Sequence, residues 1–198
     1  MKRNTVKAIL FKLFFICLAL SNFNALAQKT TIYIVRHAEK AANPADDPDL
    51  TSAGQKRAKD LIKALKREKI AGIYVTNYKR VTQTAKPTAD KFTLMPEKYD
   101  PTDLKAFAKK VYQYYSGHSV LIVGHSNTVI PTLVALGGPQ PFNTLTDDDY
   151  DMLFKLTIKD GKPELEISYY GEPHHTTMIP EQYLGYTTEH FVKPPVRF

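Results

Sequence analysis

Two histidines in this chain each follow an apolar run that is typical of a buried strand. Arg36 and His37 come directly after residues 32–35. His125 comes directly after residues 119–124. A strand that ends in this way places its last polar side chains at the carboxyl edge of a sheet, where ligands bind in open α/β sheets. The pattern therefore predicts that the two histidines converge on one anion.

A phosphoryl group is the anion that these residue types suit best. It needs cations and fixed donors around its oxygens, and a nucleophile in line with the leaving group. Arg36 and Arg80 each follow a predicted strand, and a guanidinium can bind phosphate through two parallel hydrogen bonds. His37 could attack as a neutral imidazole, and His125 could donate to a phosphate oxygen. This chemistry needs no metal ion and no other cofactor.

The elements that must position these residues alternate along the chain. We expect strands at 31–35, 72–76, 92–95 and 119–123, and helices at 51–69, 79–90, 102–115 and 127–136. Strands separated by helices imply crossovers and a parallel sheet that is covered on both faces. Residues 152–158 and 164–170, joined through Asp160-Gly161, read as an antiparallel hairpin. The fold class predicted is α/β, a three-layer α/β/α sandwich with a mostly parallel central sheet and a late antiparallel hairpin.

The first 27 residues have the pattern of a secretory signal peptide. A basic start precedes an apolar stretch at 9–20 and a small-x-small cleavage site at 25–27. The apolar stretch is shorter than the roughly 20 residues that a membrane span needs. We therefore expect cleavage after Ala27, a periplasmic or secreted location, and one domain over residues 28–198 without a membrane anchor. A retained anchor is the alternative.

Cleavage would change both the charge and the chemistry of the chain. It removes four basic residues and no acidic ones, which leaves 23 Lys and Arg against 20 Asp and Glu and lowers the net charge from +7 to +3. The basic character that would suggest nucleic-acid binding thus comes largely from the leader, and we expect no nucleic-acid partner. Cys17, the only cysteine, is lost as well. The mature chain has no disulfide and no thiolate nucleophile.

The motifs around these residues resemble the histidine phosphatase superfamily, the phosphoglycerate-mutase-like proteins. They are Arg36-His37-Ala38-Glu39, Leu50-Thr51-x-x-Gly54, Arg80-x-x-Gln83-Thr84-Ala85 and Gly124-His125-Ser126. They occur in the family's order and at its spacing over most of the mature chain. The resemblance implies a phosphoryl-transfer enzyme that works through a phosphohistidine and needs no metal.

The resemblance also implies a role for each matching residue. His37 corresponds to the histidine that is phosphorylated. Arg36 and Arg80 correspond to the two phosphate-pocket arginines, and His125 corresponds to the second pocket histidine. Asn43 lies six residues after His37, where many members carry a polar phosphate contact, although the loop around it is rich in Pro and Asp. The Thr-x-x-Gly motif of the first helix is interpreted as structural.

The sequence departs from the mutase pattern in three places. Ala38 stands where mutases usually have glycine, a replacement that resembles the small phosphatase branch. The second histidine lies in Gly-His-Ser-Asn, where mutases have His-Gly. No motif marks the general acid that a leaving alkoxide needs. Asp100 is our first choice for this acid and Glu97 is the second. Chemistry without an acid stays open for a substrate with a good leaving group, such as phosphohistidine.

Three further features favour structural interpretations. Residues 124–126 lack the second glycine of a serine-hydrolase elbow. His174 and His175 are adjacent, and neighbours on an extended segment point to opposite sides, so we expect no shared metal site. Residues 147–149, three consecutive aspartates, are expected to form a solvated loop or helix cap, with a cation site as the alternative.

Together these features predict an exported phosphoric monoester hydrolase of the histidine phosphatase type. Its substrate would be a small-molecule phosphoester or a phosphorylated macromolecule, recognised by the loops at 41–50, 95–103 and 139–149. Two alternatives stay open. The first is a catalytically weak protein that binds phosphate or a phosphosugar on the same scaffold. The second is a mutase or transferase that passes the phosphoryl group to another acceptor.

Overall fold

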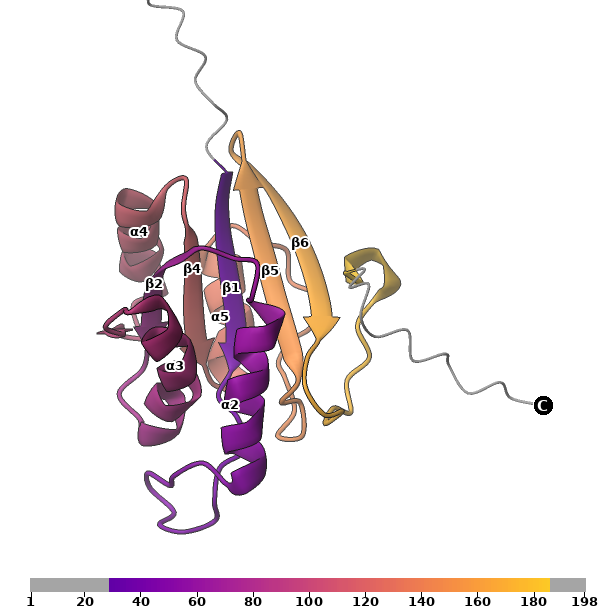
Figure 1. Ribbon diagram of the computed structural model, residues 1–198. Helices are drawn as coiled ribbons and strands as arrows, with labels where there is room; N and C mark the ends of the chain where they lie inside the picture. Colours follow the sequence, from indigo (N-terminus) through magenta and orange to yellow (C-terminus); the bar gives the residue numbers. More distant parts are fainter. Residues whose placement is uncertain (1–28, 186–198) are drawn as a thin grey trace, which may run out of the picture.

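A six-stranded sheet forms the centre of the protein, whose computed structural model describes residues 29–185 (Figure 1). The strands are β1 (Lys29–Arg36), β2 (Ile70–Val75), β3 (Glu97–Lys98), β4 (Ser119–Gly124), β5 (Met152–Lys159) and β6 (Lys162–Tyr169). Their order across the sheet is β3-β2-β4-β1-β5-β6. The first four strands in this order pair in parallel, whereas β5 pairs antiparallel with both β1 and β6.

Helices cover both faces of this sheet. They are α2 (Ser52–Ala64), α3 (Lys79–Phe92), α4 (Leu104–Tyr115) and α5 (Ser126–Ala135), followed by the short 3₁₀ helix η1 (Glu181–Tyr183). Successive residues of β1 point to opposite faces. Ile32 and Ile34 therefore pack in the cluster that includes α4 and α5, and Tyr33 and Val35 pack in the cluster that includes α2 and α3. The predicted three-layer α/β/α sandwich is confirmed.

Two predicted boundaries were wrong. The strand expected at 92–95 lies instead at Glu97–Lys98, because α3 continues to Phe92 and closes through Thr93 in the left-handed region (φ 55°). The helix expected to reach residue 69 ends at Ala64. Beyond it the N–H groups of Lys66 and Glu68 donate to carbonyls three residues earlier, so the chain tightens into turns before β2.

The predicted late hairpin is confirmed. Its turn uses Asp160 (φ 52°) and Gly161 (φ 75°), both with positive φ, which matches the right-handed twist of the strands. Between residues 29 and 185, no helix has both the length and the apolar composition required to cross a membrane. The predicted signal peptide, residues 1–27, lies outside the described residues.

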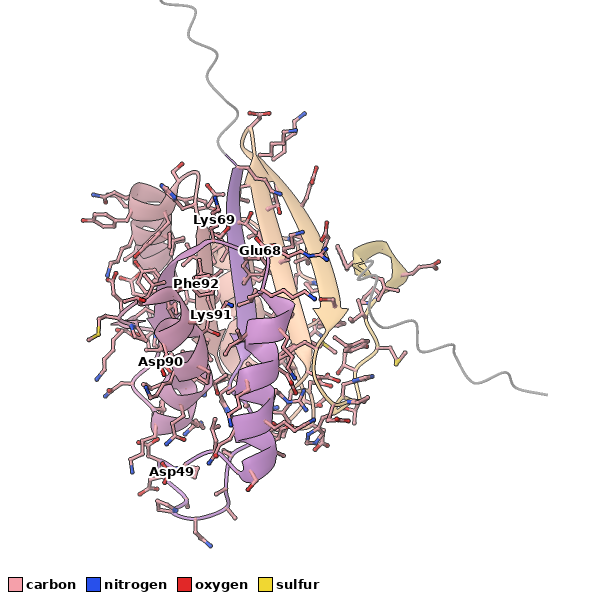
Figure 2. All side chains as sticks on the ribbon, in the orientation of Figure 1. Asp49, Glu68, Lys69, Asp90, Lys91 and Phe92 are labelled. Carbon is pink, nitrogen blue, oxygen red and sulfur yellow. The ribbon has the colours of Figure 1, made fainter. Side chains whose placement is uncertain are left out.

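The carboxyl ends of β1, β2 and β4 meet at one end of the sheet. The loop that carries Asp49 lies at this end, whereas Glu68 and Lys69, which precede β2, lie at the opposite end (Figure 2). Since parallel sheets bind ligands at the carboxyl ends of their strands, the end with Asp49 is where a functional site is expected.

Candidate active site

The two predicted histidines come together because β1 and β4 are adjacent parallel strands in register. Arg36, the last residue of β1, pairs with Gly124, the last residue of β4. The N–H of His37 donates to the carbonyl of Gly124 at 2.9 Å. The imidazoles of His37 and His125 then meet edge to face, with ring centroids 5.3 Å apart. The sheet register itself therefore forms the histidine pair.

The imidazole of His37 is held in its neutral form. Its Nδ1 lies 2.8 Å from the carbonyl oxygen of Ala38. A carbonyl oxygen only accepts, so Nδ1 carries the hydrogen and the lone pair of the neutral ring lies on Nε2. The side chain is buried, and this burial, together with the charges of Arg36 and Arg80, lowers the pKa of His37 to about 3. At neutral pH the ring is uncharged, with a free Nε2.

His125 is also neutral, and its ring is oriented from both sides. Arg80 Nη2 donates to Nδ1 at 3.4 Å, which leaves the hydrogen on Nε2, 2.8 Å from the hydroxyl of Thr76. Burial and the nearby charges of Arg80 and Arg36 lower the pKa of His125 to about 4. Its backbone N–H donates to the Thr128 hydroxyl at 2.8 Å, which fixes the start of α5.

Arg36 is buried at the end of β1 and contacts a loop more than a hundred residues away. Its Nη1 donates to the carbonyl of Thr146 at 2.7 Å, and its Nη2 lies 3.2 Å from an oxygen of Asp147. The guanidinium lies 4.1 Å from the ring centroid of Tyr150, whose hydroxyl accepts from Nη2 at 3.4 Å. The terminal nitrogens are therefore oriented by one loop.

Arg80, at the start of α3, contacts Tyr78 and the loop at 41–50. Its guanidinium lies over the ring of Tyr78, 4.3 Å from the centroid, and its Nη1 is 3.9 Å from Asp47. The Nε atoms of Arg80 and Arg36 are both buried and have no hydrogen-bond partner among residues 29–185. Because an unpaired buried N–H costs free energy, acceptor oxygens of an anion would stabilise both groups.

The motif that follows Arg80 fixes the backbone around His37. The N–H of Ala38 donates to the buried hydroxyl of Thr84 at 2.9 Å, and this hydroxyl donates to the carbonyl of Arg80 at 2.7 Å. One residue earlier, the amide of Gln83 accepts from the N–H of Leu50 and donates to Asp49, both at 2.8 Å. Helix α3 thus holds both the His37 segment and the loop at 41–50.

The Thr-x-x-Gly motif has the structural role predicted for it. Thr51 caps α2 by accepting from the N–H of Gly54 at 3.1 Å. A Cβ on Gly54 would lie 2.2 Å from the carbonyl oxygen of Glu39. Only glycine allows α2 to approach the chain this closely, two residues after His37.

The structure does not bring the other three predicted site residues into this cluster. Asn43 is exposed in its loop. Asp100 is exposed, and its carboxylate accepts from the N–H and the hydroxyl of Thr102, which lowers its pKa. Glu97 pairs with Lys110 at 2.7 Å, which lowers its pKa as well. A general acid must hold its proton near the working pH, so neither carboxyl has the environment that the role requires.

Sequence reasoning missed the loop that holds Arg36. The expectation of a solvated loop is wrong for Asp149, which is fully buried and accepts five hydrogen bonds from the N–H groups and hydroxyls of three threonines, Thr146, Thr176 and Thr177. Burial alone would raise its pKa, but these bonds lower it well below the usual range. No local pattern signals this, because two of the three partners lie nearly thirty residues further along the chain.

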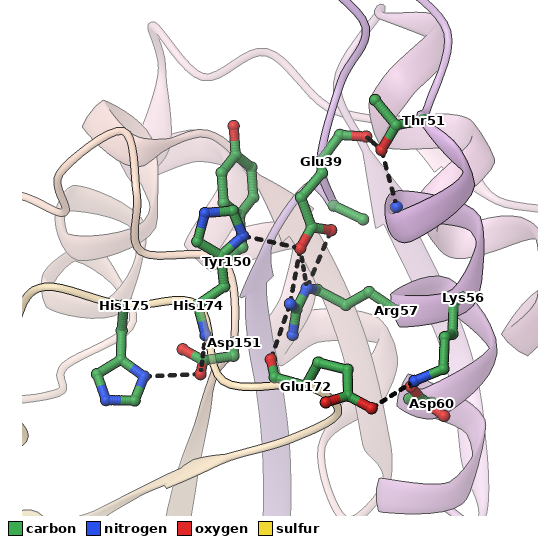
Figure 3. A network of polar contacts seen from close by, with 12 residues as sticks. Glu39, Thr51, Lys56, Arg57, Asp60, Tyr150, Asp151, Glu172, His174 and His175 are labelled. Atoms are coloured by element: carbon green, nitrogen blue, oxygen red, sulfur yellow. Dashed lines mark hydrogen bonds and ion pairs between the residues drawn. The ribbon is translucent and has the colours of Figure 1, made fainter.

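The adjacent histidines bind different carboxylates. His174 Nδ1 lies 3.0 Å from Glu39, and His175 Nδ1 lies 2.7 Å from Asp151 (Figure 3). Each imidazole therefore already has a protein partner. Across residues 29–185, no group of three or more His, Cys, Asp and Glu side chains is arranged to hold a metal ion.

With this geometry in view, residues 32–102 match the family model of the histidine phosphatase superfamily (branch 1). The matched range contains the predicted nucleophile and both arginines. The predicted resemblance to this superfamily is confirmed. The comparison with curated proteins gives no match.

Solved structures support the same class of fold. The protein histidine phosphatase SixA, in complex with tungstate, aligns with a TM-score of 0.54 at 20% identity, over 69% of this chain and 94% of that chain. Bacillus stearothermophilus YhfR aligns with a TM-score of 0.53 at 19% identity, over 69% and 95%. A candidate alpha-ribazole-5'-P phosphatase from Escherichia coli gives 0.58 at 13% identity, over 80% and 99%. At these identities the likeness establishes the fold.

Proposed function

We propose that this protein is a phosphatase that hydrolyses phosphate monoesters through a phosphohistidine on Nε2 of His37. The observation that carries the proposal is the state of the His37 ring: neutral, with Nδ1 bound to the Ala38 carbonyl and Nε2 free. A neutral imidazole with one free lone pair is the form that attacks phosphorus. The family resemblance and the similarity in fold to SixA support the same chemistry.

The phosphate group would bind between the two arginines. The unpaired Nε–H groups of Arg36 and Arg80 supply donors in addition to their terminal nitrogens. Both guanidiniums are held by protein contacts before the ligand arrives, so little reorganisation is needed when charge develops on the phosphoryl oxygens. His125 completes the pocket from the α5 side, with its ring against that of His37.

The reaction then has two steps. In the first, Nε2 of His37 forms a bond to phosphorus while the bond to the leaving oxygen breaks, and the leaving group departs with the bonding electron pair. In the second, the oxygen of a water molecule bonds to phosphorus while the nitrogen–phosphorus bond breaks. The products are the alcohol, which has gained a proton, and inorganic phosphate, and the ring returns to its starting state.

The proton for the leaving group limits the substrate. Hydrogen bonds and an ion pair lower the pKa values of Asp100 and Glu97. We therefore expect substrates whose leaving group departs without strong acid assistance. Aryl phosphates and phosphoramidates, including phosphohistidine, have this property. The likeness to SixA, a protein histidine phosphatase, supports this choice.

The proposal is tested by hydrolysis of an aryl phosphate with a chelator present, across pH 4 to 8, by the purified protein and by two variants. We expect chelator-resistant turnover that His37→Ala reduces by at least about a thousandfold. His118→Ala is the matched control, because this histidine is exposed before β4, at the other end of the sheet. Protein quenched in alkaline denaturant, in which the nitrogen–phosphorus bond of phosphohistidine survives, should carry labelled phosphate only when His37 is present.

The same experiment separates the alternatives. A binding protein would hold inorganic phosphate and show no turnover above that of His37→Ala. A transferase would show turnover that rises when an alcohol is added as a second acceptor. Hydrolysis that is unaffected by His37→Ala would contradict the phosphohistidine mechanism itself.

Export is part of the proposal and needs its own test. The pattern of residues 1–27 supports a cleaved leader. We expect the protein in its native host to be found outside the cytoplasm, with Gln28 as its amino-terminal residue. Cell fractionation with amino-terminal sequencing checks this, and a cytoplasmic chain that retains Met1 would contradict it.

A further inference from the structure

We propose that His174 is a positioning residue for Arg36. The segment 170–177 would orient the pocket guanidinium through Tyr150, although it lies more than 130 residues from Arg36 in sequence. This inference rests on the proposed function, in which Arg36 binds the phosphate group.

The orientation of Arg36 depends on one loop. Its terminal nitrogens bind the Thr146 carbonyl, the Asp147 carboxylate and the Tyr150 hydroxyl, and its plane lies against the Tyr150 ring. Asp147 is 93% exposed, so its contribution is screened by water. Tyr150 is buried, and its ring is also 6.1 Å from the ring of His37. A shift of Tyr150 would therefore shift Arg36.

Tyr150 is held by the segment 170–177. Its N–H donates to the carbonyl of His174 at 2.9 Å, and the two rings are in contact, with centroids 4.9 Å apart. On one side of Tyr150, Asp149 binds the N–H groups of Thr176 and Thr177, both at 2.9 Å. On the other side, buried Asp151 accepts from the N–H of His174 at 2.9 Å.

The His174 ring is fixed in turn from the nucleophile side of the site. Its Nδ1 donates to Glu39, which lies two residues after His37 and accepts three further hydrogen bonds from the guanidinium of Arg57 (Figure 3). Burial alone would raise the pKa of Glu39, but the bonds from Arg57 and His174 lower it. Glu39 is thus a fixed anion.

Arg57 completes the connection. Its remaining N–H groups donate to the backbone carbonyls of Tyr170 and Glu172, at 3.0 and 2.9 Å. The nucleophile segment, helix α2 and the segment 170–177 therefore share one buried ion pair. His174 is the side chain that links this ion pair to the ring beneath Arg36. Its own side chain is 42% exposed, so it can be replaced without opening the core.

The experiment measures binding of inorganic phosphate, with KM and kcat for an aryl phosphate, in the full chain. His174→Ala should weaken phosphate binding and raise KM by about threefold to tenfold, with a smaller change in kcat. His174→Asn should recover part of the loss, since an amide nitrogen can replace Nδ1 as the donor to Glu39. His118→Ala, the matched control, should leave all three values unchanged.

A double-mutant cycle separates positioning from a general loss of stability. In an Arg36→Lys background, His174→Ala should cause little further loss of phosphate binding, because the guanidinium that His174 orients is already absent. A full additional loss there, or wild-type phosphate binding in His174→Ala, would overturn the inference alone. A wild-type protein that neither binds phosphate nor turns over substrate would instead overturn the proposed function on which it rests.

Discussion

The two sides of the candidate site are built by different means. His37 and His125 are positioned by the register of two parallel strands, through backbone hydrogen bonds that depend little on side-chain identity. The loop 146–151, which holds Arg36, has no strand to fix it. Buried carboxylates fix it instead, by binding the backbone of the segment 170–177. We refer to His37 and His125, at the ends of β1 and β4, as the strand-end region. We refer to the loop 146–151, with its carboxylates, as the carboxylate-held region.

The difference between them is one of tolerance. A backbone ladder survives most substitutions, because each residue contributes the same N–H and C=O groups. A buried carboxylate that accepts five hydrogen bonds is a single point of support, since its loss leaves several donors unpaired at once. Substitutions in the strand-end region should therefore lower activity. Substitutions in the carboxylate-held region should lower the stability of the protein and its affinity for phosphate together.

After His37, the largest effect is expected at Arg36, which ends β1 and contacts the loop 146–151. Arg36→Ala should lower kcat/KM by about a hundredfold to a thousandfold, because it removes donors to the oxygens on which charge develops. Arg80→Ala should have a similar or smaller effect, since its guanidinium is more exposed, at 14% against 3%. Steady-state kinetics with an aryl phosphate measures both. A change in kcat/KM below about tenfold in Arg36→Ala would mean that this residue does not bind the phosphate group.

The next effect tests the carboxylate-held region. Asp149→Asn should lower the free energy of unfolding by about 2 kcal/mol or more, because the amide cannot replace both acceptor oxygens. KM should rise as the loop loosens its hold on Arg36. Denaturant unfolding and kinetics measure the two changes.

The chain offers a matched control one residue away. Asp148 is exposed, so Asp148→Asn removes the same charge without breaking the buried set of hydrogen bonds. It should leave both stability and KM close to those of the wild type. Equal destabilisation by the two variants would mean that charge, and not the buried contacts, determines the effect.

These two regions also differ in what the sequence could predict. Arg36, His37 and His125 could be placed because each follows an apolar strand, and strand ends of a parallel sheet meet in space. The roles of Glu39, Asp149 and His174 could not be placed. Their partners come from distant segments, and no periodicity or local motif records which carboxylate meets which backbone N–H. The hairpin was predictable, because the strand pattern and the turn residues both lie within one short stretch.

The third prediction uses acid to separate the regions. The pKa values of His37 and His125 are lowered from an ordinary value of 6.5 to about 3 and about 4. Between these values the unfolded chain binds protons that the folded chain does not. Stability due to the two neutral rings is therefore complete above pH 6.5 and is lost as the pH falls toward 4 for His125 and toward 3 for His37. The ordinary pKa of Asp149 is 3.8, so the stability due to its ionised carboxylate is lost only below about pH 4.

Melting temperatures recorded from pH 8 to pH 3 test this order. His125→Ala should reduce the decline between pH 6.5 and 4, leaving the part due to His37, and should leave the fall below pH 4 in place. Asp149→Asn should do the reverse. If His125→Ala left the upper part of the curve unchanged, its ring would not be buried and neutral as described.

The smallest effect is expected at Asp100, which lies outside both regions. Its carboxylate caps the turn at Thr102 and is exposed, so Asp100→Asn should change kcat/KM for an aryl phosphate by less than about twofold, whereas loss of a general acid costs about a hundredfold or more. An alkyl phosphate is the stricter substrate, because its leaving group needs the proton more. A loss confined to the alkyl phosphate would assign Asp100 as the acid and would mean that its loop moves toward His37 when substrate binds. No loss with either substrate would mean that the leaving group itself determines the rate. That outcome fits a site that contains two neutral histidines and two arginines without a protonated carboxyl beside them.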